Sequence, residues 1–415
     1  MNANDRALTG FTMLGHATFH TYELVIPLFV VVWLDEFGLT PAVIGVVVGA
    51  SYALTGVGAL PAGLLADAYS AKRLVLICIA GMAAGFALLA TARGLAMITI
   101  GLLVWGAASS VYHPAGLTLI SRGAEARGTA FAYHGIAGNV GVAMGPLLGA
   151  VLLVFLDWRA VVLALVAPAA VALILATRLQ FNETAGTAAR ETDGGEKTEG
   201  LRDLRSVVAD SKVLFAGGFA LVFLVGNLYG LYYRGAFTFL PEVLAGFAVF
   251  DPITLGSQAI EPSRYVYSGL LVFGAAGQYV GGKLVDRVPA ERALVGSFVA
   301  LAFVAAVFIP AAAAGLVPLL VAAALLGFLV FMEAPINQEV VSRHVPPEAR
   351  GLSFGYTYLA VFGVGAAGAA GAGLVLTRSS ATALFGALTA VAAVAAVLGL
   401  VLHRRFVPWG TTKPD

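Results

Sequence analysis

Charged side chains are scarce in this sequence, since Asp, Glu, Lys and Arg make up 11% of its 415 residues. A soluble protein needs roughly a quarter of its residues charged. The formal net charge is +1, so the sequence also lacks the excess of one sign that would indicate a nucleic-acid or acidic partner. Cysteine is nearly absent, and Cys78 alone excludes an intrachain disulfide framework.

Apolar side chains dominate instead, at 60% of residues and a mean hydropathy of +0.91. They gather in stretches of about 20 residues or more, the length that crosses a bilayer core as a helix. Each span must be helical, because the bilayer interior offers no water to backbone amides. The predicted spans are 10–34, 42–66, 73–91, 95–120, 127–156, 159–177, 213–246, 265–285, 292–313, 316–341, 352–376 and 381–402.

The distribution of Lys and Arg over the connections fixes the expected orientation. Nineteen lie at the termini and the even-to-odd connections, four lie on the opposite side, and Arg234 lies inside a span. We therefore expect both termini in the cytoplasm and the chain in the cell membrane. No cleavable signal peptide is expected, because the first apolar stretch has no charged leader or small-residue cleavage site.

A polar segment divides the chain nearly in half. Residues 179–212 are low in hydrophobicity and mixed in charge, which is typical of a linker, with a short surface helix near Leu201–Val208. The predicted organisation is a six-helix bundle over 1–178, this cytoplasmic linker, a second bundle over 213–403 and a tail over 404–415. The seventh span is long enough to be kinked, and 247–264 is a long external loop.

The two halves repeat short patterns in the same order. Gly63-x-x-x-Asp67 recurs as Gly282-x-x-x-Asp286, and Glu125-Ala126-Arg127-Gly128 recurs as Glu348-Ala349-Arg350-Gly351. Pro114 matches Pro335, so the offsets of 219, 221 and 223 are nearly constant. Duplicated halves around a central cavity are a common design of secondary transporters.

These loop patterns resemble the signature of the major facilitator superfamily, and Gly141-x-x-x-Gly145-Pro146-x-x-Gly149 resembles its antiporter motif. Within the superfamily, Gly15-His16 and Ser109–Pro114 look most like fosmidomycin-resistance-type exporters. The resemblance implies an all-α membrane protein of twelve transmembrane helices in two pseudo-symmetric six-helix bundles. The arginine that many antiporters of the superfamily carry in helix four is missing from Gly101–Gly106, so a coupling mechanism through it does not carry over.

The resemblance also implies that Asp67 belongs to a cytoplasmic latch that opens and closes during transport; a loop cap is the structural alternative. Glycine at 63 and 282 should let a helix end approach its neighbour closely. Small residues in the fifth span should allow close packing, and Pro146 should bend that helix as a hinge. The full gating set is Gly63, Asp67, Lys72, Arg73, Arg122, Arg127, Gly282, Asp286, Arg287 and Arg350.

The first span carries the strongest chemical signal. His16, His20 and Glu23 are spaced i, i+4, i+7 and so share one helix face. An ionised carboxylate is costly in the hydrocarbon core, which indicates a cavity or a bound proton at Glu23. Two histidines and a carboxylate can also bind a metal. We favour histidines hydrogen-bonded in a polar cavity, so no metal and no cofactor are expected.

Two further charges lie inside predicted spans. Glu333 and His20 join Glu23 as proton-coupling candidates. Aligning Pro27 with Pro241 places Arg234 at the position of His20 in the other half, where it either attracts an anionic substrate or neutralises Glu23 or Glu333. The remaining cavity candidates are Tyr112, His113, His134, Asn139, Asn227, Tyr233, Gln278 and Asn337, for which packing and interhelical hydrogen bonds are the structural alternatives.

The leading hypothesis is a monomeric, proton-coupled exporter of small polar or anionic compounds, drugs included; sodium is the other coupling ion to consider. The second hypothesis is a proton symporter that imports an organic acid, sugar or other nutrient. A metal-dependent membrane enzyme is a third, and it requires further ligands near His16 and His20. No nucleotide-binding signature is visible, which disfavours ATP-driven transport.

Overall fold

The computed structural model describes residues 1–187, 204–256, 258–345 and 350–406, which are almost entirely helical. Contacts divide the chain into two compact units. The first holds the described residues of Met1–Phe29 and Leu54–Arg202, and the second holds those of Val30–Ala53 and Asp203–Asp415. Two helices, α1 (Ala3–Glu36) and α2 (Pro41–Val57), contribute residues to both units.

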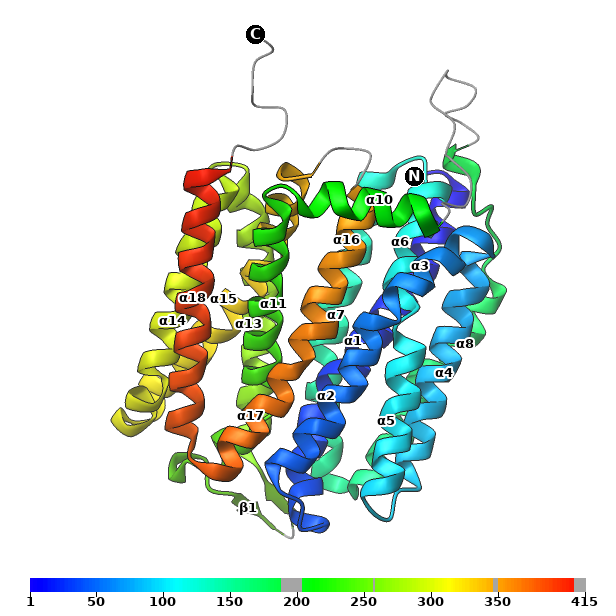
Figure 1. Cartoon of the computed structure of the whole chain (residues 1–415). Coiled ribbons are helices and arrows are strands. Elements are labelled where there is room, and N and C mark those ends of the chain that lie inside the picture. Colours follow the sequence, from blue (N-terminus) through cyan, green and yellow to red (C-terminus); the bar gives the residue numbers. More distant parts are fainter. Residues whose placement is uncertain (188–203, 257, 346–349, 407–415) are drawn as a thin grey trace. The chain divides into compact units, whose positions relative to one another are not determined.

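In its described residues the first unit is completed by six helices, with α4 packed against α5 and α8 (Figure 1). The predicted span 95–120 is divided into two helices, because Pro114 has no N–H to donate to the carbonyl of Ser110. Side-chain oxygens of Ser70 and Asp157 cap α4 and α8. The helices are α3 (Ala59–Ala68), α4 (Ala71–Ala90), α5 (Leu95–Ser109), α6 (Tyr112–Gly123), α7 (Arg127–Phe155) and α8 (Trp158–Arg178).

The described part of the second unit holds nine further helices, among which α13 packs against α15 and α14 runs beside α18 (Figure 1). They are α10 (Leu204–Phe215), α11 (Phe219–Phe237), α12 (Leu240–Ala245), α13 (Pro262–Val285), α14 (Ala290–Ala314), α15 (Leu316–Arg343), α16 (Arg350–Tyr358), α17 (Ala367–Arg378) and α18 (Ala381–Arg405). A π-helical turn, η3 (Leu359–Gly363), and a 3-10 turn, η4 (Val364–Ala366), join α16 to α17.

The long loop predicted at 247–264 contains a small structured element. A 3-10 turn, η1 (Ala248–Phe250), precedes an antiparallel hairpin of β1 (Ile253–Leu255) and β2 (Gln258–Ile260). Ile253 pairs with Ile260, and Gly256, which follows β1, has a positive φ of +65°, a conformation that glycine adopts readily. This two-stranded hairpin is the only sheet in the described residues, so the predicted all-α class holds.

The apolar helices match the predicted membrane spans. Among the described residues, ten helices are long and apolar enough to cross a membrane, and the α10–α11 pair makes an eleventh if it counts as one span. The predicted span 265–285 lies in α13, which is outside that set but has 24 residues. At 1.5 Å per residue, a helix of that length covers the ~30 Å core. The protein is therefore a multi-pass α-helical membrane protein.

The predicted seventh span, 213–246, is wrong in its boundaries. The axes of α10 and α11 differ by 84° across the break that contains Gly217 and Gly218. The span proper is α11, and α10 runs across its end (Figure 1). Two adjacent glycines carry no side chain to favour a continuous helix, which accounts for the break at this place. The surface helix predicted near Leu201–Val208 starts at Leu204 in the described residues.

Candidate functional site

Three polar side chains of α1 lie on one helix face, as their spacing predicts. His20 Nδ1 is 2.6 Å from Glu23 Oε2, and His20 Nε2 is 3.1 Å from His16 Nε2. At the other end, His16 Nδ1 is 2.7 Å from the carbonyl oxygen of His134 on α7. The side chains thus form one hydrogen-bonded chain, which ends on the fully buried carboxyl of Glu23.

The direction of these hydrogen bonds follows from their partners. A carbonyl oxygen only accepts, so His16 Nδ1 carries a proton and donates it to His134. The contacts between His16 and His20 and between His20 and Glu23 each need a proton as well. Two neutral imidazoles supply two protons, so the third belongs to Glu23 or makes one imidazole cationic. In each case the side chains of His16, His20 and Glu23 together carry no net charge. They share three protons, one more than two neutral imidazoles supply.

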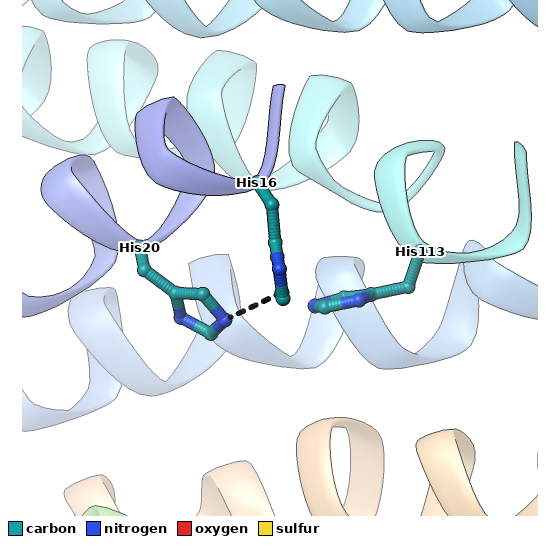
Figure 2. Close-up of side chains that lie close together, drawn as sticks. All are labelled: His16, His20 and His113. Atoms are coloured by element: carbon teal, nitrogen blue, oxygen red, sulfur yellow. Dashed lines mark hydrogen bonds between the residues drawn. The ribbon is translucent and has the colours of Figure 1, made fainter. Parts of the chain in front are cut away.

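Helix α6 adds two aromatic side chains to this cluster. The ring of Tyr112 stacks on His16 with centroids 5.5 Å apart, and its hydroxyl donates to the carbonyl of Thr12. The ring of His113 lies edge-on to His16 at 5.3 Å. Figure 2 shows His113 reaching from its own helix toward His16 and His20. His134 also stacks on His16 at 3.9 Å, so four of the predicted cavity residues gather around one imidazole.

The glycines of α7 form the surface on which α1 rests. A methyl group at Gly138 would be 2.5 Å from Cε1 of His16, and Gly141 and Gly145 face the backbones of Ala17 and Thr21 in the same way. The motif that resembles an antiporter signature therefore allows close packing, as predicted. Gly149 continues the strip against Val25. Pro146 lies inside a continuous α7, and its role as a hinge stays a prediction.

The structure brings together a different set of candidate metal ligands from the one the sequence indicates. Ring nitrogens of His16, His20 and His113 all lie within 4.8 Å of one another. Glu23 is not in this set, because its carboxyl contacts the far nitrogen, Nδ1, of His20. The helix spacing pointed to His16 and His20, but the approach of His113 depends on the packing of α6 and has no sequence signal.

In the second unit, the buried Arg234 of α11 lies among aromatic rings. Its guanidinium carbon is 3.7 Å from the ring centroid of Tyr52, 4.8 Å from that of Tyr233 and 5.3 Å from that of Phe362. Such contacts stabilise a cation electrostatically through the ring quadrupole. Sequence reasoning included Tyr233 but missed Tyr52 and Phe362, which reach Arg234 from α2 and from the π-helical turn η3.

Glu333 has a separate environment in the same unit. Ser297 of α14 donates a hydrogen bond to Glu333 Oε2, and the carboxyl is fully buried on α15. Oε1 has no hydrogen-bond partner among the described residues. That Arg234 neutralises Glu333 stays a prediction. Asn337, one turn further along α15, is also buried.

The remaining polar candidates are less closely placed. Asn227 donates to the carbonyl of Phe223 in its own helix, so this hydrogen bond is not the interhelical one given above as the structural alternative. Asn139 on α7 and Gln278 on α13 are half-buried.

The predicted gating loop of the first unit is held by the start of the linker. Lys72 Nζ donates to the carbonyl of Leu179 at 2.6 Å and lies over the ring of Phe181. The carboxylate of Glu183 accepts from Ser70 Oγ and from the backbone N–H of Lys72. Sequence reasoning missed these partners, because it assigned the start of 179–212 no contacts with the rest of the chain.

Two other gating residues of this unit are placed by backbone contacts. The N–H of Arg73 donates to Ser70 Oγ, and Arg122 Nη1 lies 3.4 Å from the carbonyl of Ala66. The side chain of Asp67 is outside the described part of the chain, so its predicted pairing has no description here. Arg127 is the first residue of α7.

The charged residues of the second gating loop are exposed. Lys283 Nζ and Asp286 Oδ2 are 3.9 Å apart and both are exposed, and Arg287 follows the end of α13. The close approach predicted at Gly63 and Gly282 is wrong, because a methyl group at either glycine would meet no described atom within 4 Å. Both lie on helix surfaces without a neighbour at that point. The side chain of Arg350 is outside the described residues.

Comparison with known proteins finds a matching family model and two relatives. A family model of the Major Facilitator Superfamily matches residues 11–370 and, in a second match, 263–414. An uncharacterized MFS-type transporter, YfnC of Bacillus subtilis (strain 168), is 26% identical over 283 residues, which are 67% of this chain and 64% of the relative. A triacylglyceride transporter of Mycolicibacterium smegmatis is 30% identical over 141 residues, 33% of this chain and 24% of the relative. The chain thus spans less than two thirds of each relative's length.

Solved transporter structures share the fold over nearly the whole chain. The nucleoside transporter NupG, as its D323A mutant, has a TM-score of 0.76 at 17% identity, covering 97% of this chain and 100% of its own. A bacterial homologue of the human lysosomal transporter Spinster, inward-facing and occupied, has a TM-score of 0.74 at 14% identity, covering 99% and 100%. At these identities the likeness concerns the fold alone.

Proposed function

Because the chain belongs to the Major Facilitator Superfamily, we propose that it is a secondary active exporter that exchanges protons for small polar or anionic compounds, drugs among them. The family and the transporters of the same fold make it a membrane transporter of a small-molecule substrate and not an enzyme. The direction, the coupling ion and the substrate class are our proposal.

The observation that carries the proposal is the hydrogen-bonded chain from His134 through His16 and His20 to Glu23. An ionised carboxyl at membrane depth is costly unless it is paired. The shared proton supplies that pairing, whether it lies on Glu23 or on an imidazole. Its release would give this chain of side chains one negative charge and break one of the three contacts. Proton loss is thereby linked to the hydrogen bonding of the polar face of α1, which is what a coupled transporter needs.

Glu333 is the second proposed proton carrier. Its carboxyl is buried in α15 with Ser297 as hydrogen-bond partner, so it too is an ionisable group at membrane depth. Such groups are rare in membrane spans and usually belong to ion or substrate pathways. A sodium ion is the alternative cargo for either carboxyl.

Arg234 is the proposed anchor for an anionic group of the substrate. It is the one cation predicted inside a span, and its guanidinium lies against the rings of Tyr52, Tyr233 and Phe362. A planar guanidinium binds carboxylates and phosphates through paired N–H donors. Neutralisation of Glu23 stays the alternative role.

Export is favoured over import by two resemblances. The strip of Gly141, Gly145, Pro146 and Gly149 is similar to the antiporter motif, and Ser109–Pro114 is similar to fosmidomycin-resistance-type exporters. A symporter that imports an organic acid, sugar or other nutrient is the second candidate, since the same fold serves both directions. We further propose a monomer in the cell membrane with cytoplasmic termini and a latch that includes Asp67.

Transport into inverted membrane vesicles tests the coupling. A panel of polar and anionic compounds is offered with an imposed proton gradient, and Glu23→Gln is compared with the native protein in the presence of a metal chelator. We expect uptake that stops when the proton gradient is collapsed. Glu23→Gln should lose this gradient-driven uptake but still exchange substrate across the membrane when the pH is equal on both sides. Retained exchange shows that the variant is folded.

The matched control is Asp251→Asn, which removes an exposed carboxyl and should leave uptake unchanged. A sodium gradient forms the second arm. Uptake that ignores collapse of the proton gradient would refute proton coupling, and full activity of Glu23→Gln would make that residue structural. Accumulation only in right-side-out vesicles would favour the symporter.

A further inference from the structure

We propose that His16, His20 and His113 form a binding site for a divalent transition-metal ion such as Zn²⁺ or Co²⁺. The three imidazoles come from α1 and α6, and a nitrogen of each lies within 4.8 Å of the other two. Figure 2 shows the three rings directed toward a common region between the two helices. The site would bind the metal ion whether or not the protein transports protons.

Two of the three imidazoles are oriented as metal-bound histidines usually are. A ligating histidine commonly donates its second ring N–H to a carboxylate or a backbone carbonyl, which fixes the ring and the tautomer. His20 Nδ1 contacts the carboxylate of Glu23 at 2.6 Å, and His16 Nδ1 contacts the carbonyl of His134 at 2.7 Å. In both residues Nε2 is therefore the nitrogen that faces the common region.

The distance between these two nitrogens suits a shared cation. His16 Nε2 and His20 Nε2 are 3.1 Å apart. Two ligands about 2.0–2.1 Å from a tetrahedral metal are separated by roughly 3.4 Å, so a small opening of this contact accommodates the ion. From the outer limit of 4.8 Å, His113 would have to approach by up to about 1.4 Å to reach that separation. The metal would take the place of the proton between the two Nε2 atoms.

The chemistry of the donors selects the class of ion. Imidazole nitrogen suits Zn²⁺, Co²⁺, Ni²⁺ and Cu²⁺, whereas Mg²⁺ and Ca²⁺ prefer oxygen ligands. Three protein ligands leave a fourth position open for water or another donor, as in non-structural zinc sites. The carboxylate of Glu23 supplies a negative charge through His20, which partly offsets the charge of the ion in this buried place.

Cobalt binding to the purified full chain tests the site. The protein is prepared in detergent with a tag that contains no histidine, and the visible absorption of bound Co²⁺ is titrated and then competed with Zn²⁺. We expect one Co²⁺ per chain with the spectrum of nitrogen ligands. His113→Gln should bind at least about 10-fold more weakly, since the loss even of an outer partner costs 10–100-fold. For that reason Glu23→Gln should also weaken binding about 10-fold.

Matched variants keep the test decisive. His403→Gln removes a histidine of the last turn of α18, outside the site, and should bind Co²⁺ as the native chain does. His113→Cys, which offers a thiolate at the same position, should restore binding and shift the absorption, also if His113→Gln folds poorly. Absence of saturable binding to the native chain overturns the proposal, and so does binding that His113→Gln leaves unchanged or that His403→Gln abolishes.

Discussion

At the scale of single residues, the environment of Arg234 is the clearest difference between the two units. The guanidinium lies 3.7 Å from the ring centroid of Tyr52, and the side chain is 3% exposed. The aromatic faces stabilise the cation through the ring quadrupole. The proposed role of Arg234 as an anchor for an anionic group can be tested on this charge.

Removal of this charge should weaken the binding of anionic substrates more than that of neutral ones. We expect Arg234→Ala to weaken an anionic substrate by roughly 10- to 150-fold, since hydrogen bonds to charged groups contribute about 1.5–3 kcal/mol. A neutral substrate should lose much less. Arg234→Lys keeps the charge but not the planar fork, so it should recover only part of the affinity.

Competition between labelled and unlabelled compounds in vesicles measures these affinities. Arg378→Ala removes an exposed arginine of the same unit and serves as the control. Equal losses for anionic and neutral substrates would assign Arg234 a structural role.

At the scale of helices, the glycine strip of α7 determines how closely α1 approaches. Gly138, Gly141 and Gly145 face His16, Ala17 and Thr21, so the packing surface of α7 is directly behind the histidine face of α1. A side chain at Gly141 or Gly145 would meet backbone atoms of α1, and one at Gly138 would meet the ring of His16. The position of His16 thus depends on residues that carry no chemistry themselves.

Alanine at two glycines of α7 should have opposite effects on stability. Gly138→Ala places a methyl group 2.5 Å from His16, and overpacking of this kind costs about 1–3 kcal/mol. Gly135→Ala meets no described atom within 4 Å and should gain up to about 1 kcal/mol from helix propensity. Thermal unfolding in detergent compares the two, with a lower midpoint expected for Gly138→Ala alone. Equal midpoints would mean that α1 shifts to accommodate the methyl group without loss of stability.

Helices and their faces follow well from this sequence, whereas partners between helices do not. The length of the apolar stretches predicts the spans, and the spacing of His16, His20 and Glu23 predicts their common face. The contacts of Ser297 with Glu333 and of Tyr52 with Arg234 join positions 36 and 182 residues apart. Such pairs depend on the register and rotation of packed helices. The length of the seventh span indicated a kink, but its place at Gly217 and Gly218 was not predicted, because hydropathy does not register a change of direction.

At the scale of the whole molecule, each unit repeats one packing device. In the first unit the glycines of α7 receive α1, and in the second Gly230 of α11 meets Gly365 while Gly368 faces the backbone of Leu231. The first and fifth predicted spans of each half are thus joined through small residues. This likeness extends the sequence repeat to the packing of helices within each unit.

The predicted orientation of the chain can be measured with single cysteines. In a Cys78→Ala background, Thr254→Cys on the exposed β1 should react with a membrane-impermeant maleimide on intact cells. Asp286→Cys, at the exposed end of α13, should react only after the cells are permeabilised. The Cys78→Ala chain without a new cysteine gives the background. Reversed labelling would place the termini outside the cytoplasm.

The π-helical turn η3 has a geometric consequence for Arg234. A π-helical turn closes its hydrogen bond one residue later than an α-helical turn, so it stores one extra residue in the helix. If the π-helical turn shifted along the helix, each residue that it passed would rotate about the helix axis by about 100°, the angle per residue of an α-helix. Phe362 lies in this turn, and such a step would carry its ring away from the guanidinium while both ends of the segment stay in place.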